Sequence, residues 1–269
     1  MNLLKYLYGT RSGRLLLKPL TSPAVSRLAG HLLDLPISRL LIPDFVKANR
    51  IPMEEFQKTE YRSFNEFFCR KIRPGLRPVD PSPSHLIAPC DGLLRIYPVT
   101  QDLVLPVKQS HFTISSLLRS RSLAQKFEGG YCMVFRLCVN HYHRYCYPDN
   151  AIAGREIRIP GIYHTVRPVA LESLPVFLEN TREYCLLKTE HFGTLVQMEV
   201  GAMLVGRICN EHGAGPVKRG EEKGYFQYGG STVILLVPKD RVTIPDPAPF
   251  SDETPVRMGQ MIGKLRAHE

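Results

Sequence analysis

One short segment of the chain places a nucleophile where the backbone is free to bend sharply. Gly229 and Gly230 precede Ser231, and an apolar run over 233–236 follows. Because glycine lacks a β-carbon, the two glycines permit backbone angles that present the Gly230 carbonyl to the Ser231 hydroxyl. The segment therefore suits attack by the serine on its own backbone. A flexible turn entering a strand has the same pattern.

Two other segments carry groups for proton transfer. Asp91 lies in a Pro-Cys-Asp-Gly turn before a predicted strand, and His141 and His143 lie at the end of another. A serine hydroxyl is a weak nucleophile at neutral pH and needs a base oriented by a carboxylate, roles that His143 and Asp91 fit for Ser231. Taken alone, the aspartate turn is more typical of structure than of catalysis, and the histidines fit either use.

A metal site is the alternative use of the histidine segment. His141, His143 and Cys146 form a His-x-His-x-x-Cys pattern that a zinc-dependent hydrolase could employ, but no fourth ligand is evident nearby. The seven cysteines include no CxxC pair, which indicates neither a zinc ribbon nor a disulfide framework and fits a reducing compartment. Proton transfer is therefore the favoured interpretation, with no metal expected.

Residues 1–50 predict basic, amphipathic helices. Eight basic side chains against two acidic ones give this segment +6 of the chain's total of +10. Ser22 and Pro23 mark a helix start, and Pro36 and Pro43 divide the apolar cluster that follows into short helices. Such helices pack on a core or lie in a lipid interface, and the charge favours an interface with anionic headgroups. No membrane-spanning stretch or signal peptide is predicted.

From about residue 88 the pattern changes to short β-rich runs punctuated by glycine and proline. Strands are predicted over 131–139, 193–208 and 231–237, with a weaker pattern over 183–188. The form V-[KR]-x-G-x-x-x-G-x-apolar occurs at 217–226 and again at 256–265, as paired turns of a lipoyl-carrier-like β-sandwich would. The predicted fold class is α+β, mostly β: a lipoyl-carrier-like β core with N-terminal amphipathic helices.

Together these segments resemble the phosphatidylserine decarboxylase family. The resemblance covers nearly the whole chain and rests on the order and spacing of several motifs, each weak alone. They are FNEFFxR at 64–70, PxDG at 89–92, YHR at 142–144, VGAxxVG at 200–206 and KGYFxxGGST at 223–232.

The resemblance implies a self-processing enzyme that makes a pyruvoyl cofactor from its own serine. In that family the serine attacks the preceding carbonyl, an ester forms, and elimination leaves a new chain that begins with pyruvoyl. Here cleavage between Gly230 and Ser231 would give a β chain of residues 1–230 and an α chain of residues 231–269, which stay associated. The pyruvoyl carbonyl would take up the amine of phosphatidylserine as a Schiff base and act as the electron sink for loss of CO2, yielding phosphatidylethanolamine.

One departure from the family pattern concerns the base. The family commonly has a second histidine three residues after the first, assigned as the partner of the aspartate, and this chain has Cys146 there. Only His143 is therefore carried over, as the base for processing and the proton donor for the decarboxylated intermediate. The expected catalytic residues are Asp91, His143 and Ser231.

The expected organisation has a membrane-associating segment, 1–50, and a decarboxylase core, 51–269. The resemblance and the charge imply a peripheral protein on the cytoplasmic face of the cell membrane, with phosphatidylserine and an anionic surface as partners and no nucleic acid. A homo-oligomer is compatible with these expectations. A non-catalytic lipid-binding module that keeps the fold without processing stays open as a further alternative.

Overall fold

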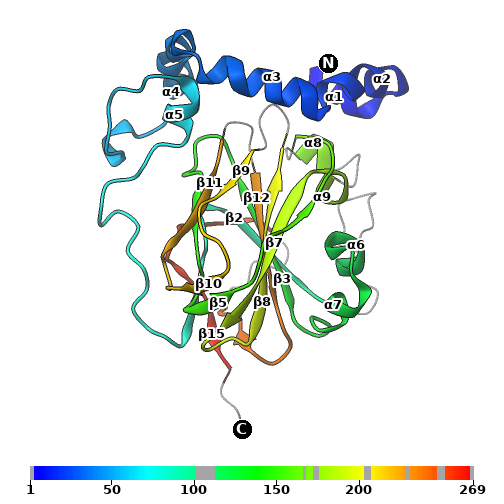
Figure 1. The fold of residues 1–269 in the computed structure, drawn as a ribbon, viewed down its shortest axis with the longest axis vertical. Helices are drawn as coiled ribbons and strands as arrows, with labels where there is room; N and C mark the ends of the chain where they lie inside the picture. The colour runs from blue at the N-terminus through cyan, green and yellow to red at the C-terminus, as the bar shows by residue number, and fades with distance from the viewer. Residues whose placement is uncertain are drawn as a thin grey trace.

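A computed structural model describes residues 3–100, 113–165, 168–171, 176–202, 207–227, 231–246 and 252–266. Short helices lie across one end of a β-rich body (Figure 1). We call these elements the helical layer: α1 (Leu3–Gly9), α2 (Arg11–Leu20), α3 (Pro23–Asp34), the 3-10 helix η1 (Pro36–Leu41) and α4 (Ile42–Asn49). A second 3-10 helix and α5 connect the layer to the body: η2 (Met53–Glu55) and α5 (Phe64–Phe68).

Local chemistry explains where the longest helix begins and which way it faces. The Ser22 side chain accepts a hydrogen bond from the Val25 N–H, and Pro23 occupies the first turn of α3. Ser26 is buried towards the body, whereas Leu28 and Leu32 are more than half exposed. The predicted series of broken amphipathic helices is confirmed. None of the helices in the described ranges is long and apolar enough to cross a bilayer.

The described part of the body centres on a nine-stranded antiparallel sheet. Its strands in spatial order are β10 (Gly215–Val217), β5 (Ala151–Ala153), β7 (Arg182–Thr189), β8 (Thr194–Gly201), β12 (Ser231–Val237), β3 (Tyr131–Leu137), β2 (Gly92–Pro98) and β14 (Thr254–Val256), with β6 (Ile157–Ile159) also paired to β7.

Two three-stranded sheets and four short helices complete the described body. The sheets are β1 (His85–Ile87), β15 (Met261–Leu265) and β13 (Val242–Thr243), and β4 (Arg144–Cys146), β11 (Glu222–Phe226) and β9 (Ile208–Asn210). The helices are α6 (Ile114–Leu118), α7 (Arg121–Gln125), α8 (Pro168–Leu171) and α9 (Val176–Glu179). The predicted class, α+β and mostly β, is confirmed.

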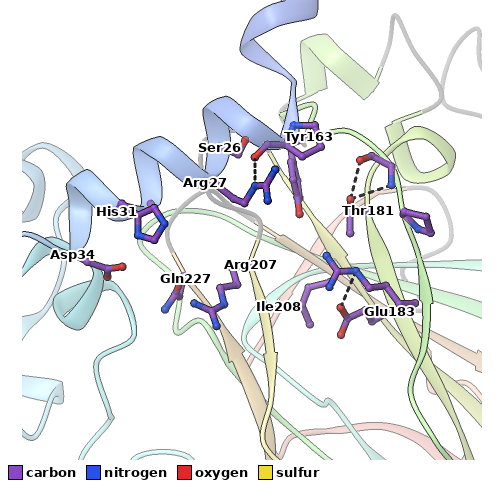
Figure 2. Close-up of a pocket in the computed structure, with 15 residues that line it drawn as sticks. Ser26, Arg27, His31, Asp34, Tyr163, Thr181, Glu183, Arg207, Ile208 and Gln227 are labelled. Carbon is purple, nitrogen blue, oxygen red and sulfur yellow. Dashed lines mark hydrogen bonds and ion pairs between the residues drawn. The ribbon is translucent and has the colours of Figure 1, made fainter.

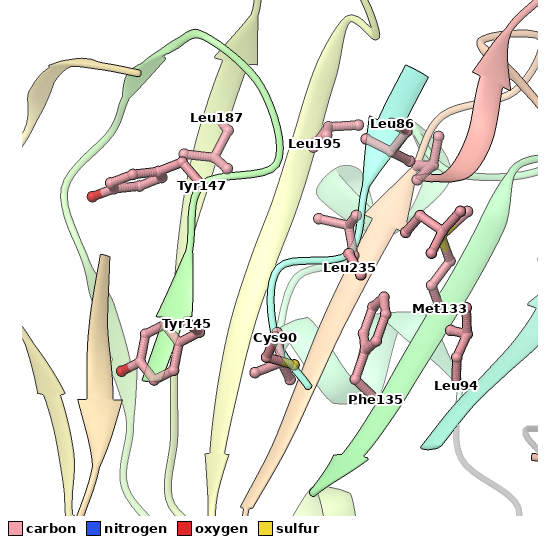
Figure 3. Packing of buried hydrophobic residues seen from close by; sticks show 14 of the residues in the cluster. Leu86, Cys90, Leu94, Met133, Phe135, Tyr145, Tyr147, Leu187, Leu195 and Leu235 are labelled. Atoms are coloured by element: carbon pink, nitrogen blue, oxygen red, sulfur yellow. The ribbon is translucent and has the colours of Figure 1, made fainter. Parts of the chain in front are cut away.

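Strand β12 is central to the packing of the body. Successive side chains of a strand point to opposite faces, so β12 contributes to two cores. Leu235 packs in one core with Met133 and Phe135 (Figure 3), while Ile234 and Leu236 pack in the other beneath α6 and α7. Because β12 also pairs with β3 and β8 along its length, its first residue has a fixed position.

The repeated motif forms two similar turns that pack on one segment. Gly220 and Gly259 both have positive φ, 76° and 85°, which favours glycine. A β-carbon on Gly220 would lie 2.6 Å from the Val79 side chain, and one on Gly259 would lie 2.6 Å from the Pro78 carbonyl oxygen. The two glycines therefore allow both turns to approach residues 78–79.

Candidate active site

Neighbouring strands of the large sheet place Ser231 in a row of strand ends. Ser231, the first residue of β12, lies opposite Leu137 at the end of β3 and opposite Gly201 at the end of β8. Gly92 begins β2 directly after Asp91, and the β2–β3 register brings it to the same row. Ala202, just after β8, belongs to a buried cluster shared with α1 and α2. The row therefore faces the helical layer.

His143 is held as a neutral base. Its ring is buried, and its Nδ1 lies 2.9 Å from the carbonyl oxygen of His141. Because a carbonyl only accepts, Nδ1 carries the proton and Nε2 keeps its lone pair. Burial, reinforced by the nearby Arg70 charge, holds the pKa of His143 well below its usual value. Nε2 is buried with no hydrogen-bond partner in the described residues, so its lone pair is available to a hydroxyl.

Asp91, which directly precedes β2, is held in place by a guanidinium group and a backbone amide. Arg77 Nε lies 2.8 Å from Oδ1 and Arg77 Nη2 lies 2.7 Å from Oδ2, and the Met258 N–H donates to Oδ1 at 2.9 Å. No hydrogen bond joins Asp91 to His143 within the described ranges. In this structure the backbone at His141, and not Asp91, orients His143. The sequence offered no signal for Arg77, which lies in an irregular segment.

His141 lies between the aspartate and the serine strand. Its Nδ1 accepts the Cys138 N–H at 3.1 Å, directly after the residue paired with Ser231, so the proton of the neutral ring is on Nε2. Burial lowers the pKa of His141, and the Asp91 carboxylate partly opposes that effect. Both side chains line one cavity of about 390 Å³. His141 thus supplies a donor, not a base, near the end of β3.

Cys146 is unsuited to proton abstraction in this structure. Its side chain is buried in β4, and burial raises the pKa of the thiol to about 12. A thiol with so high a pKa stays protonated at neutral pH. Across the part of the chain that the structure describes, no three His, Cys, Asp or Glu side chains converge as metal ligands would.

Part of the processing motif lies outside the described residues. The backbone of Ser231 is described, but Gly229 and Gly230 are not, nor are residues 203–206 of the VGAxxVG motif. The predicted approach of the Gly230 carbonyl to the Ser231 hydroxyl therefore stays a prediction.

A larger cavity opens beneath α3, and we call it the α3 cavity. It measures about 610 Å³, and α3 forms one wall while the sheet edge forms the other (Figure 2). Thr181 lines it, and the Thr181 carbonyl accepts the Gly201 N–H at 2.9 Å. Since Gly201 pairs with Ser231, this wall of the cavity lies two strands away from the serine strand. No pattern in the sequence predicted this cavity.

The fold thus provides a serine at the start of a central strand and a buried neutral histidine, the two kinds of group that activation of a hydroxyl requires. Residues 64–264 match the family model described as phosphatidylserine decarboxylase. The chain is 40% identical over 267 residues to phosphatidylserine decarboxylase proenzyme 2 of Clostridium acetobutylicum, covering 97% of this chain and 91% of that relative. The corresponding proenzyme of Ruminiclostridium cellulolyticum is 38% identical over 271 residues, with 97% and 90% coverage. The chain belongs to the phosphatidylserine decarboxylase family.

Proposed function

We propose that this chain is a phosphatidylserine decarboxylase proenzyme that cleaves itself between Gly230 and Ser231 and then converts phosphatidylserine to phosphatidylethanolamine. Its relatives carry the name of that proenzyme. The observation that carries the proposal is the position of Ser231 at the start of β12, in the same row of strand ends as Gly92, which directly follows Asp91. The buried neutral base, His143, supports it.

Processing requires a base with a free lone pair. In the proposed reaction the Ser231 hydroxyl attacks the Gly230 carbonyl carbon while His143 Nε2 accepts the hydroxyl proton, and the peptide bond becomes an ester. The amine of residue 231, released as the ester forms, takes up the proton. Elimination then removes the α-hydrogen of residue 231 and breaks the bond between the serine oxygen and its β-carbon, which releases residues 1–230 with a free carboxylate and leaves dehydroalanine at residue 231. Uptake of water and loss of ammonia leave pyruvoyl at residue 231.

Two buried side-chain atoms, one of them next to residue 231, suit a pyruvoyl group. Thr232 Oγ1 and His143 Nε2 are both buried without a hydrogen-bond partner in the described residues, as expected of a site that receives another polar group. The pyruvoyl group would supply an electron sink for decarboxylation. His143 Nε2 carries no proton in its neutral state, so it would first take up the proton that the substrate ammonium loses and then deliver it to the carbon that has lost CO2. Asp91, fixed by Arg77, would add a stationary negative charge directly before β2.

The packing of β12 supports lasting association of the two chains. The proposed α chain begins with β12, which pairs with β3 over seven residues and with β8 over six. Its apolar side chains are buried in both cores. After cleavage these contacts would hold the α chain within the body.

The surface of the helical layer supports a peripheral membrane location, on an anionic leaflet such as the cytoplasmic face of the cell membrane. Exposed leucine and isoleucine side chains cover it beside the excess positive charge noted above. Single exposed apolar residues are common, but nine of them between residues 15 and 41 indicate an interaction surface. The group comprises Leu15, Leu16, Leu20, Leu28, Leu32, Leu35, Ile37, Leu40 and Leu41.

A decarboxylation assay tests the activity. Purified protein incubated with vesicles that contain phosphatidylserine should release CO2 and form phosphatidylethanolamine, and the Ser231→Ala variant should form none. If the unsubstituted protein binds the vesicles but forms no product, it is the non-catalytic lipid-binding module and the proposed activity is wrong.

A further inference from the structure

The α3 cavity contains more positive charge than its own carboxylates neutralise. Of the two acidic side chains in its lining, Glu183 pairs with Arg158 at 3.6 Å, and Asp34 accepts a hydrogen bond from the Asn65 amide at 2.9 Å. Two further arginines line the same cavity, Arg27 and Arg207.

Neither Arg27 nor Arg207 forms an ion pair with a carboxylate in the described residues. Arg27 Nε donates weakly to the Pro23 carbonyl at 3.4 Å. Arg27 comes from α3 and Arg207 from the opposite wall, next to Gln227 (Figure 2). Both arginines are exposed at the cavity, and guanidinium groups on facing walls suit an anion placed between them, because each has several fixed N–H donors.

An unpartnered hydroxyl in the same wall points to an oxygen ligand. Ser26, which lines the cavity, is only 4% exposed, and its Oγ has no hydrogen-bond partner in the described part of the chain. A buried hydroxyl without a partner is costly, and an anionic oxygen placed between Arg27 and Arg207 would satisfy it.

The position of the cavity indicates which anion it receives. Leu28 and Leu32 lie on the exposed side of the helix whose inner side carries Ser26. On the other side, Thr181 connects the cavity through Gly201 to Ser231. A molecule bound here with its apolar chains at α3 and an anionic group beneath the helix would extend its remaining end towards β12, two strands from Thr181.

We propose that Arg27 and Arg207, with the Ser26 hydroxyl, bind the phosphodiester of a glycerophospholipid headgroup in the α3 cavity. This inference rests on the proposed function, because it orients the substrate amine towards residue 231. The arginines are binding and positioning residues, and they take no part in breaking bonds.

Binding to a protein that cannot turn over tests this proposal apart from catalysis. The full-length Ser231→Ala chain is titrated calorimetrically with sn-glycero-3-phosphoserine, with inorganic phosphate and with serine. We expect the glycerophospho compound to bind best. Adding Arg27→Gln or Arg207→Gln should weaken its binding roughly tenfold or more, and Ser26→Ala roughly threefold. Arg14→Gln, an equal charge change on α2 outside the cavity, should change binding less than twofold.

A second measurement separates positioning from general damage. With Ser231 present, Arg207→Gln should raise the KM for phosphatidylserine vesicles by a larger factor than it lowers kcat. The proposal is overturned if both cavity variants bind like Arg14→Gln, or if inorganic phosphate binds as tightly as the glycerophospho compound. If the arginine variants bind the glycerophospho compound more weakly but the unsubstituted protein forms no product, the headgroup site stands and the proposed decarboxylation fails.

Discussion

His143 combines three properties that a base for self-cleavage needs: a fixed ring, a neutral state and an unshared lone pair at Nε2. The Cys146 thiol is a poorer proton acceptor, because burial raises its pKa and keeps it protonated at neutral pH. We therefore expect His143→Ala to stop processing and Cys146→Ser to leave it largely intact. Denaturing gels of the two variants distinguish them. If Cys146→Ser blocked cleavage while His143→Ala spared it, the base would be Cys146.

The lowered pKa of His143 also predicts how stability responds to acid. Between its folded pKa and about 6.5, the unfolded chain binds a proton that the folded chain does not. Stability should therefore fall as pH drops below 6.5, by at most about 1.4 kcal/mol for each pH unit from this group. Urea unfolding at pH 7 and pH 5.5 measures the loss. The His143→Gln variant should lose less stability between these two pH values than the unsubstituted protein. Equal losses would contradict the lowered pKa of His143.

At the scale of single residues, the sequence identified the functional side chains but not the contacts that orient them. The motifs led to Asp91, His143 and Ser231. The triad-like pairing of Asp91 with His143 was inferred by analogy, whereas the structure pairs Asp91 with Arg77 and gives His143 a backbone partner. Such partners depend on tertiary packing. Arg77 lies in an irregular segment, which has no periodic pattern from which its contact with Asp91 could be predicted.

Among the elements, the outer face of α3 makes the most direct prediction about membranes. Replacing Leu28, Leu32 and Leu35 together by serine removes apolar contact area and leaves the charge unchanged. We expect less co-sedimentation with phosphatidylserine vesicles, as we do on deleting residues 1–50. High salt should also weaken binding, since the Debye length falls from ~10 Å at 0.1 M to ~3 Å at 1 M.

The matched control for these leucines lies on the strands of the body. Ile152→Ser with Ile157→Ser changes exposed apolar residues of β5 and β6 and should leave sedimentation unchanged. Equal loss in both variants, or unchanged binding after deletion of residues 1–50, would remove the helical layer from the membrane contact.

A buried ion pair joins β11 to β8 across two sheets. Lys223 Nζ lies 2.6 Å from Glu199 Oε2, and both side chains are fully buried. Burial raises the pKa of Glu199 to about 7, while the carboxylates around Lys223 raise the pKa of the lysine. Lys223→Met should destabilise the fold by about 3–5 kcal/mol in urea, because it leaves Glu199 buried without its cation. Adding Glu199→Gln should recover part of that loss, and no recovery would argue against a pairwise contact.

Three predicted strands match observed strands to within two residues at each end, including 131–139, of which β3 covers all but the last two residues. The strand predicted over 231–237 is β12, and that predicted over 183–188 is β7, extended by a residue at each end. The single strand predicted over 193–208 is wrong: β8 ends at Gly201, and Ile208 begins β9 in a different sheet. Alternating apolar residues show that a segment is extended, but they do not show which sheet it joins.

For the whole molecule, the order of strands could not be predicted, because antiparallel pairing joins segments far apart in the chain. β12 lies between β8 and β3, although β3 precedes it by about a hundred residues. The proposed cleavage would therefore create the new chain end at a strand start inside the sheet, two strands from the Thr181 wall of the α3 cavity.

Intact mass under denaturing conditions tests the central claim of self-cleavage most directly. We expect the purified protein to give two masses, one for residues 1–230 and one for residues 231–269 with pyruvoyl in place of the N-terminal serine. The Ser231→Ala variant should give one mass for the uncut 269-residue chain. A single full-length mass for the unsubstituted protein, or cleavage of Ser231→Ala at the same bond, would contradict the account.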